Sequence, residues 1–220
     1  MVRFATGNVR DAPLILFGGS FDPVHVGHVA LVKQLLRRGG RVCMLASVNP
    51  PFRNAPKADV GDRKAMLVLA LKGEADVCVA SAGDVCDSPY TIDLLREVRA
   101  RIGSSAPLAW AMGSDQYAKL NTWRDWTQLT KLAHLLVFRR AGDADEVHRD
   151  VKRKWALRRA AMNDLGASPG GCVAEFSPPL PCVSSTDIRS RLGAGDAMNE
   201  LVPPSVLEYI VSRGLYDTGH

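Results

Sequence analysis

The sequence has little cysteine, and its cysteines follow no pattern that would make them act together. There are five among 220 residues, an odd number, and no pair has the Cys-x-x-Cys spacing. This argues against a zinc site and against a disulfide framework. We therefore expect reduced cysteines, with Cys43 and Cys78 as small core residues in apolar stretches.

Long hydrophobic stretches are also missing. The longest apolar run begins at Ala65 and ends at Leu71, whereas a membrane-spanning helix needs about 20 apolar residues. The N-terminal residues contain no apolar segment before their charges recur, so no secretory signal is expected. These absences predict a cytoplasmic chain with no membrane partner.

The composition is that of a globular protein with a moderate excess of positive charge. Hydrophobic residues make up 46% of the chain and charged residues 23%. At roughly 100 to 200 residues per domain, and without a visible linker or repeat, residues 1–220 are interpreted as one domain. The 28 basic and 23 acidic side chains give a formal net charge of +5, which favours anionic partners. Charge alone does not separate a nucleotide from a nucleic acid.

Short apolar stretches alternate with longer stretches of helical pattern. Strands are expected at residues 14–17, 42–48, 77–80, 108–112, 134–138 and 173–176. Helices are expected at residues 26–38, 63–72, 91–101 and 145–163, with short C-terminal helices at 185–192 and 205–213. Because parallel strands need crossover connections, this alternation predicts an α/β fold with a Rossmann-like, doubly wound, mostly parallel sheet. Ligands of such sheets bind beyond the carboxyl ends of the strands.

The strongest local motif, called the first motif below, follows the first expected strand. It reads Gly-Gly-Ser-Phe-Asp-Pro-Val-His-Val-Gly-His, beginning at Gly18 and ending at His28. Gly18 and Gly19 allow a tight turn and close approach of a ligand, and the helix start beyond them offers N–H groups to an anion. His25 and His28 share one helix face, with Gly27 between them, so both imidazoles can donate to phosphate oxygens. A single histidine would more readily be a capping or core residue, but the pair beyond Gly-Gly-Ser favours phosphate.

A second motif lies far along the chain and reads Ser-Ser-Thr-Asp-Ile-Arg, from Ser184 to Arg189. Its hydroxyl residues can cap backbone N–H groups at a helix start, where an anion is again favoured. Arg189 adds a planar, permanently charged guanidinium that suits phosphate oxygens. Taken alone, the motif fits a well-capped surface helix equally well. Together with the first motif it indicates a second phosphate contact.

With both motifs in this order, the chain resembles the nucleotidyltransferases that carry a Thr/His-x-Gly-His motif and an Ile-Ser-Ser-Thr-x-Ile-Arg motif. Within that superfamily it is similar to the bacterial nicotinate-nucleotide adenylyltransferases over about residues 14–216. The resemblance implies catalytic roles for His25, His28 and Arg189. It implies ATP contacts for Gly18, Gly19, Ser20, Phe21, Gly27, Gly113, Asp115, Ser184, Ser185, Thr186 and Ile188.

The resemblance also covers a mononucleotide site. Family members match here at Ser-Pro-Tyr-Thr before a helix and at Thr-Trp after the Gly-Ser-Asp turn. The implied mononucleotide contacts are Arg53, Tyr90, Thr91, Trp123 and Arg140. Judged without the family, Trp123 and Trp126 would be a core pair at helical spacing, and Tyr90 with Thr91 a simple helix cap. The sequence departs from the family at Phe52, where a histidine commonly follows the double proline.

The resemblance implies adenylyl transfer from ATP to nicotinate mononucleotide in NAD biosynthesis, with release of pyrophosphate. Mg²⁺ is expected to come with ATP, and no residue is expected to be a dedicated metal ligand. Two alternatives stay open: another enzyme of the superfamily, such as pantetheine-phosphate adenylyltransferase, or a module that binds nucleotide or RNA without turnover. A nucleic-acid partner is not expected, and the sequence does not indicate the oligomeric state.

Overall fold

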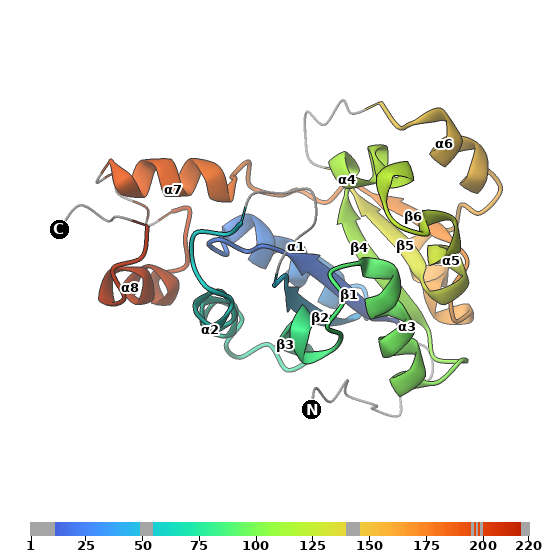
Figure 1. Ribbon diagram of the computed structural model, residues 1–220, viewed down its shortest axis with the longest axis horizontal. Coiled ribbons are helices and arrows are strands. Elements are labelled where there is room, and N and C mark those ends of the chain that lie inside the picture. The colour runs from blue at the N-terminus through green and yellow to red at the C-terminus, as the bar shows by residue number, and fades with distance from the viewer. Residues whose placement is uncertain are drawn as a thin grey trace.

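The computed structural model describes residues 12–48, 55–139, 146–194, 196, 198 and 200–216. Six parallel strands form one sheet in the order β3-β2-β1-β4-β5-β6 (Figure 1). The strands are β1 (Leu14–Gly19), β2 (Arg41–Ala46), β3 (Val77–Ser81), β4 (Leu108–Gly113), β5 (His134–Phe138) and β6 (Val173–Phe176). The predicted α/β class and Rossmann-like parallel sheet are therefore confirmed.

Helices connect and cover these strands. The α-helices are α1 (Val26–Leu36), α2 (Val60–Ala70), α3 (Thr91–Ile102), α4 (Ser114–Ala118), α5 (Leu129–Leu132), α6 (Arg149–Trp155), α7 (Ser185–Gly193) and α8 (Pro204–Ser212). The 3-10 helices are η1 (Ala82–Asp84), η2 (Leu120–Thr122), η3 (Trp126–Gln128) and η4 (Met162–Ala167). The helix expected from residue 63 begins earlier because the Asp59 side chain caps it, accepting from the N–H of Asp62 at 2.7 Å. Across the described ranges, a helix both long and apolar enough to cross a bilayer is not found.

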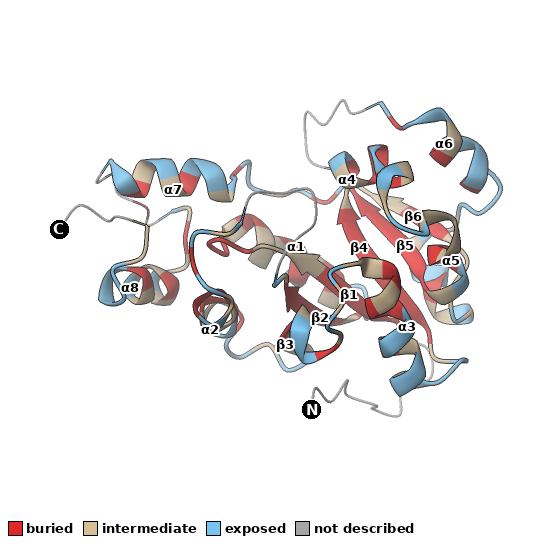
Figure 2. Ribbon diagram, viewed as in Figure 1, coloured by how far each residue is buried: buried red, intermediate tan, exposed pale blue. Residues whose placement is uncertain are grey.

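The sheet is buried on both faces because successive side chains of a strand point to opposite sides. Ile15 and Phe17 of β1 face a core that also holds apolar residues of α1, α2, α7 and α8. Leu14 and Leu16 of β1 face the second core, which is completed by α3, α4, α5 and α6. Figure 2 shows the buried residues gathered on the strands and on the helix sides that face them. The sheet is therefore the middle layer, with α1, α2, α7 and α8 on one face and α3, α4, α5 and α6 on the other.

The helix predicted over residues 145–163 is wrong in its length. α6 ends at Trp155, Leu157 is fully exposed, and Arg159 forms a parallel bridge with Val173. The N–H of Val173 donates to the carbonyl of Arg158 at 2.8 Å. Because β6 is an edge strand with open hydrogen-bonding groups, this segment pairs with it instead of continuing the helix.

The sheet has a switch point between β1 and β4. These strands are neighbours, yet α1 after β1 packs on one face, whereas α4 and α5 after β4 pack on the other. Diverging connections leave a crevice outside the carboxyl ends of the two strands, where doubly wound sheets bind ligands. The first motif follows β1 at this crevice, and Gly113 ends β4 there.

Candidate active site

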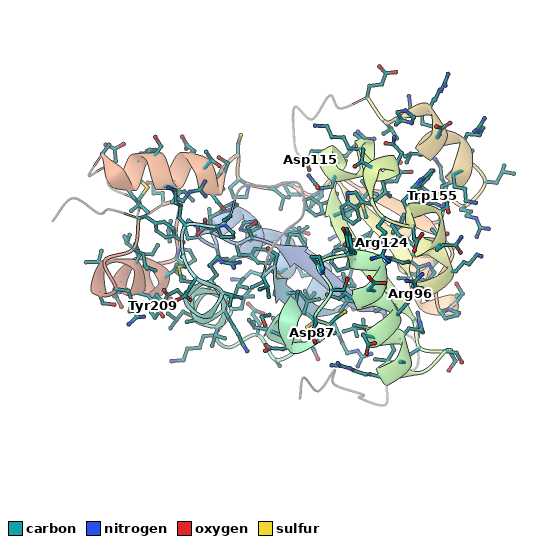
Figure 3. All side chains as sticks on the ribbon, viewed as in Figure 1. Asp87, Arg96, Asp115, Arg124, Trp155 and Tyr209 are labelled. Atoms are coloured by element: carbon teal, nitrogen blue, oxygen red, sulfur yellow. The ribbon has the colours of Figure 1, made fainter. Side chains whose placement is uncertain are left out.

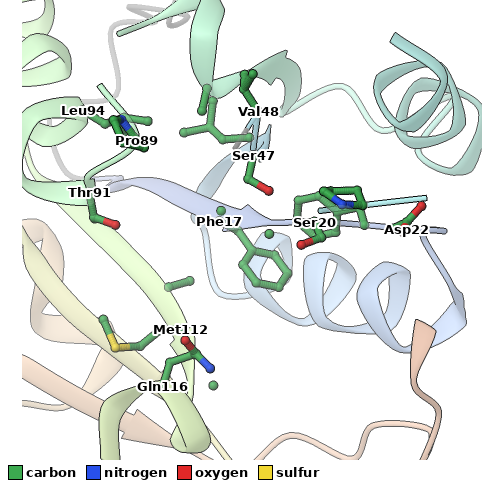
Figure 4. A pocket seen from close by; sticks show the side chains of 18 of the residues that line it. Phe17, Ser20, Asp22, Ser47, Val48, Pro89, Thr91, Leu94, Met112 and Gln116 are labelled. Atoms are coloured by element: carbon green, nitrogen blue, oxygen red, sulfur yellow. The ribbon is translucent and has the colours of Figure 1, made fainter. Parts of the chain in front are cut away.

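A cavity of about 960 Å³ opens at this switch point, beyond the carboxyl ends of β1, β2, β4 and β5. Ser20, Ser47, Thr91 and Gln116 surround it, each from a different segment (Figure 4). Most of the residues selected from the sequence line this cavity. They are Gly18, Gly19, Ser20, Phe21, His25, His28, Tyr90, Thr91, Gly113, Asp115, Trp123, Ser184, Ser185, Thr186 and Arg189.

Four of the selected residues are not placed in the cavity wall. Ile188 is fully buried in the core, so its side chain contributes packing. Gly27 is buried beside His25, and an added Cβ there would lie 3.1 Å from the imidazole. Arg53 and Arg140 lie outside the described residues, as does the family departure at position 52.

The paired glycines of the first motif make room for aromatic side chains. A Cβ on Gly18 would collide with the ring of Trp110, and a Cβ on Gly19 would come within 2.9 Å of the Phe21 ring. The left-handed backbone of this turn is at Phe21, with φ of 50°. The glycines are therefore required by close packing at the end of β1 more than by their own torsion angles.

Replacing Gly18 by alanine tests this packing. We expect Gly18→Ala to destabilise the chain by about 1 to 3 kcal/mol in urea unfolding, the usual cost of overpacking. Trp110→Phe removes the ring atoms that a Cβ would meet, so the Gly18→Ala cost should shrink in that background. An equal cost in both backgrounds would contradict the proposed collision.

The two histidines of the first motif stack on each other at the start of α1. Their ring centroids are 3.7 Å apart with an interplanar angle of 24°. The backbone N–H of His25 donates to Nδ1 of His28 at 3.3 Å. Because a backbone N–H can only donate, a neutral His28 imidazole carries its proton on Nε2. His28 therefore combines a capping acceptor with a second ring nitrogen that can donate to an anion.

The structure brings the second motif against the first. Arg189 Nη1 donates to the main-chain carbonyl of Asp22 at 2.6 Å, and the Ser185 hydroxyl donates to the carbonyl of Pro23 at 2.8 Å. The Ser184 side chain caps α7 by accepting from the N–H of Asp187 at 3.1 Å. The imidazoles and the guanidinium thus line one cavity although they are far apart in the chain.

Sequence reasoning missed a group of buried polar residues beneath this junction. The Asp22 carboxylate accepts from the N–H groups of Lys57 at 2.8 Å and Ala58 at 3.1 Å. Arg63 is 1% exposed, and its Nη1 donates to the carbonyl of Ser20 at 2.8 Å. Burial lowers the pKa of the Arg63 guanidinium, and the Asp22 charge partly opposes that shift. In the sequence, Asp22 is marked only by its position inside the first motif. Nothing in the sequence pattern marks Arg63 as a site residue.

The other end of the cavity is aromatic. Tyr90 precedes α3, and the Arg124 guanidinium lies over its ring at 4.9 Å. Trp123 lines the cavity, whereas Trp126 packs edge-on against Trp155 at 5.3 Å. Both tryptophans pack against the second core, as their spacing predicts, and Trp123 in addition lines the cavity. Asp87, Asp115 and Arg124 line the cavity from separate segments, with Asp115 on α4 (Figure 3).

Comparisons with known proteins agree with this geometry. The family model described as cytidylyltransferase-like matches residues 16–191. A Stenotrophomonas maltophilia protein named "probable nicotinate-nucleotide adenylyltransferase" is 35% identical, covering 92% of this chain and 96% of the relative. A Yersinia enterocolitica protein of the same name is 35% identical, covering 91% and 94%. In fold, the chain is similar to the structure of Plasmodium falciparum nicotinic acid mononucleotide adenylyltransferase complexed with NaAD. The TM-score is 0.71 and the sequence identity is 15%, and the match covers 94% of this chain and 98% of that chain. The chain therefore belongs to the cytidylyltransferase-like family and, within it, to the nicotinate-nucleotide adenylyltransferases.

Proposed function

We propose that this chain, acting as a single domain, transfers the adenylyl group of ATP to nicotinate mononucleotide, forming deamido-NAD and pyrophosphate in NAD biosynthesis. One observation carries the proposal: the two distant motifs place His25, His28 and Arg189 around one cavity. Family membership narrows the acceptor to a pyridine mononucleotide.

The triphosphate of ATP would lie between the first and second motifs. His28 would donate from Nε2, and Arg189, which is hydrogen-bonded to Asp22 of the first motif, would contribute a positive charge. The adenosine would extend toward Gly113 and Asp115 at the end of β4.

The mononucleotide would occupy the aromatic end. The Trp123 and Tyr90 rings can pack against a pyridine ring, and the N–H groups at the start of α3 can bind its carboxylate. Arg53 and Arg140 are proposed as further mononucleotide contacts from the family resemblance. The acceptor phosphate would then face the α-phosphorus of ATP.

The reaction needs charge stabilisation more than a general base. An oxygen of the acceptor phosphate bonds to the α-phosphorus while the bond to the β-phosphate oxygen breaks and pyrophosphate leaves. Since the attacking oxygen is already anionic, no proton has to be removed. Rate acceleration in such transfers comes from positioning and from groups that meet the developing charge. His25, His28 and Arg189 are placed for this role.

The donor set suits Mg²⁺ that arrives with the nucleotide. The described ranges contain no group of three or more His, Cys, Asp or Glu side chains that could hold a metal ion. Asp22 is already engaged by backbone N–H groups. Phosphate oxygens would therefore be the main ligands of Mg²⁺, which would neutralise part of the triphosphate charge.

A substrate panel scored by pyrophosphate release tests the proposed function. We expect turnover with ATP and nicotinate mononucleotide, and at least tenfold lower kcat/KM with nicotinamide mononucleotide, which lacks the carboxylate charge. Equal rates with both would contradict the roles of Tyr90, Thr91 and Trp123. Turnover with phosphopantetheine would support the superfamily alternative. RNA binding with a steep salt dependence and no pyrophosphate would support a non-catalytic module.

A further inference from the structure

Asp22 is a buried carboxylate at the edge of the cavity, beside Ser20 (Figure 4). It is 4% exposed, so its charge needs nearby donors. Besides the N–H groups of Lys57 and Ala58, it accepts from the Tyr216 hydroxyl, which donates to Oδ1 at 2.8 Å. Tyr216 lies 194 residues further along the chain and follows α8. The C-terminal segment is thus tied directly to the first motif.

The Tyr216 backbone is held in an unfavourable conformation. Its φ of 67° lies in the left-handed region, which a bulky aromatic residue rarely adopts. Such torsion angles persist where the surrounding structure imposes them, and they cluster at functional sites. Burial and the adjacent Asp22 charge raise the pKa of the Tyr216 hydroxyl. The phenol therefore stays protonated and donates to the carboxylate.

Asp22 also faces Arg189, which contacts it through the main-chain carbonyl and through the carboxylate. Arg189 Nη1 donates to the Asp22 main-chain carbonyl at 2.6 Å, but lies 3.7 Å from carboxylate Oδ2. The latter distance is beyond a hydrogen bond. The carboxylate accepts its hydrogen bonds from Tyr216 and from backbone N–H groups, so its ion pair with Arg189 is made without a direct hydrogen bond. Arg189 Nη2 donates to the Thr186 hydroxyl at 3.3 Å, and the side chain lines the cavity.

We propose that Tyr216 is a positioning residue for the triphosphate: its hydroxyl holds the Asp22 carboxylate in place, and the carboxylate in turn sets how Arg189 meets the phosphates. Without the hydroxyl, Oδ1 of Asp22 loses a donor and the carboxylate turns toward Arg189. A closer ion pair then withdraws the guanidinium from ATP. This inference rests on the proposed function in one respect, that ATP occupies the cavity.

The decisive comparison is between Tyr216→Phe and Tyr209→Phe. Tyr209, labelled in Figure 3, offers a matched control because its hydroxyl also donates to a carboxylate at 2.8 Å, that of Asp62 on α2. Neither tyrosine is among the residues that line the cavity. We expect Tyr216→Phe to raise the Kd for α,β-methylene-ATP about tenfold in calorimetry, as loss of one charge-assisted hydrogen bond allows. The KM for nicotinate mononucleotide should change less than twofold. Tyr209→Phe should leave both values unchanged.

A double variant shows whether Tyr216 acts through Arg189. Adding Tyr216→Phe to Arg189→Ala should cause no further loss of analogue binding. Wild-type binding by Tyr216→Phe, equal weakening of both substrates, or additive losses in the double variant would each overturn the proposal. Analogue binding is measured without turnover. A wild-type protein that binds the analogue but releases no pyrophosphate would refute the proposed function while leaving this test intact.

Discussion

His28→Ala is expected to lose about 10²- to 10³-fold in kcat, the usual effect of removing one preorganised donor that meets transition-state charge, about 2.7 to 4 kcal/mol. The reason is the proton on Nε2, which the backbone hydrogen bond to Nδ1 fixes in place. A group held before the reaction begins needs no reorganisation when charge develops on the triphosphate. Single-turnover measurement of pyrophosphate release, with circular dichroism of the folded variant, checks the result.

Two further variants separate the donor role of His28 from its capping role. Asparagine places an oxygen near the Nδ1 position but has no donor near Nε2, so His28→Asn should keep the cap and still lose catalysis. His148→Ala is the control, since His148 caps α6 through the N–H of Asp150 and does not line the cavity. Near-normal turnover by folded His28→Asn would refute the donor role. Slow turnover by His148→Ala would show that losing a histidine outside the cavity also slows the reaction.

The sheet could be predicted because its strands carry their own signal. The central strands are short apolar runs buried on both faces, and the helical stretches between the strands can only be crossovers. The end of α6 could not be predicted in this way. Its sequence continues with helical periodicity beyond Trp155, but Arg159 pairs with Val173 on the edge strand. That competition between helix and sheet involves residues distant in sequence.

In the site, too, local features could be predicted from the sequence and contacts between distant residues could not. The two motifs could be recognised because each is a short contiguous run of sequence that leads into a helix. The residues that hold them have distant partners: Arg63 reaches Ser20 across 43 positions, and Tyr216 reaches Asp22 across 194. Trp123 and Trp126 show the same limit. Their spacing predicts the core that both pack against, but not that Trp123 also lines the cavity.

Arg63→Met should give the largest loss of stability among these variants, about 3 kcal/mol. The guanidinium donates from Nε to the carbonyl of Ala58 at 3.0 Å and from Nη1 to that of Ser20 at 2.8 Å. Methionine fills similar volume but leaves both buried carbonyls without these donors, at about 1 to 3 kcal/mol each, partly offset because no charge remains to be desolvated. Against a typical total of about 5 to 15 kcal/mol, such a loss is large.

Urea unfolding of Arg63→Met and Arg153→Met makes this prediction specific to burial. The side chain of Arg153 is 84% exposed and pairs with Asp150 on the surface of α6, so its replacement should cost less than about 1 kcal/mol. Arg63 also spans the loop at Ala58 and the first motif at Ser20, so its loss should weaken ATP binding in the molecules that stay folded. Similar urea midpoints for the two variants would show that the buried Arg63 guanidinium does not stabilise the fold. If Arg63→Met were as stable as the wild type but no longer bound ATP, Arg63 would instead belong to the binding surface.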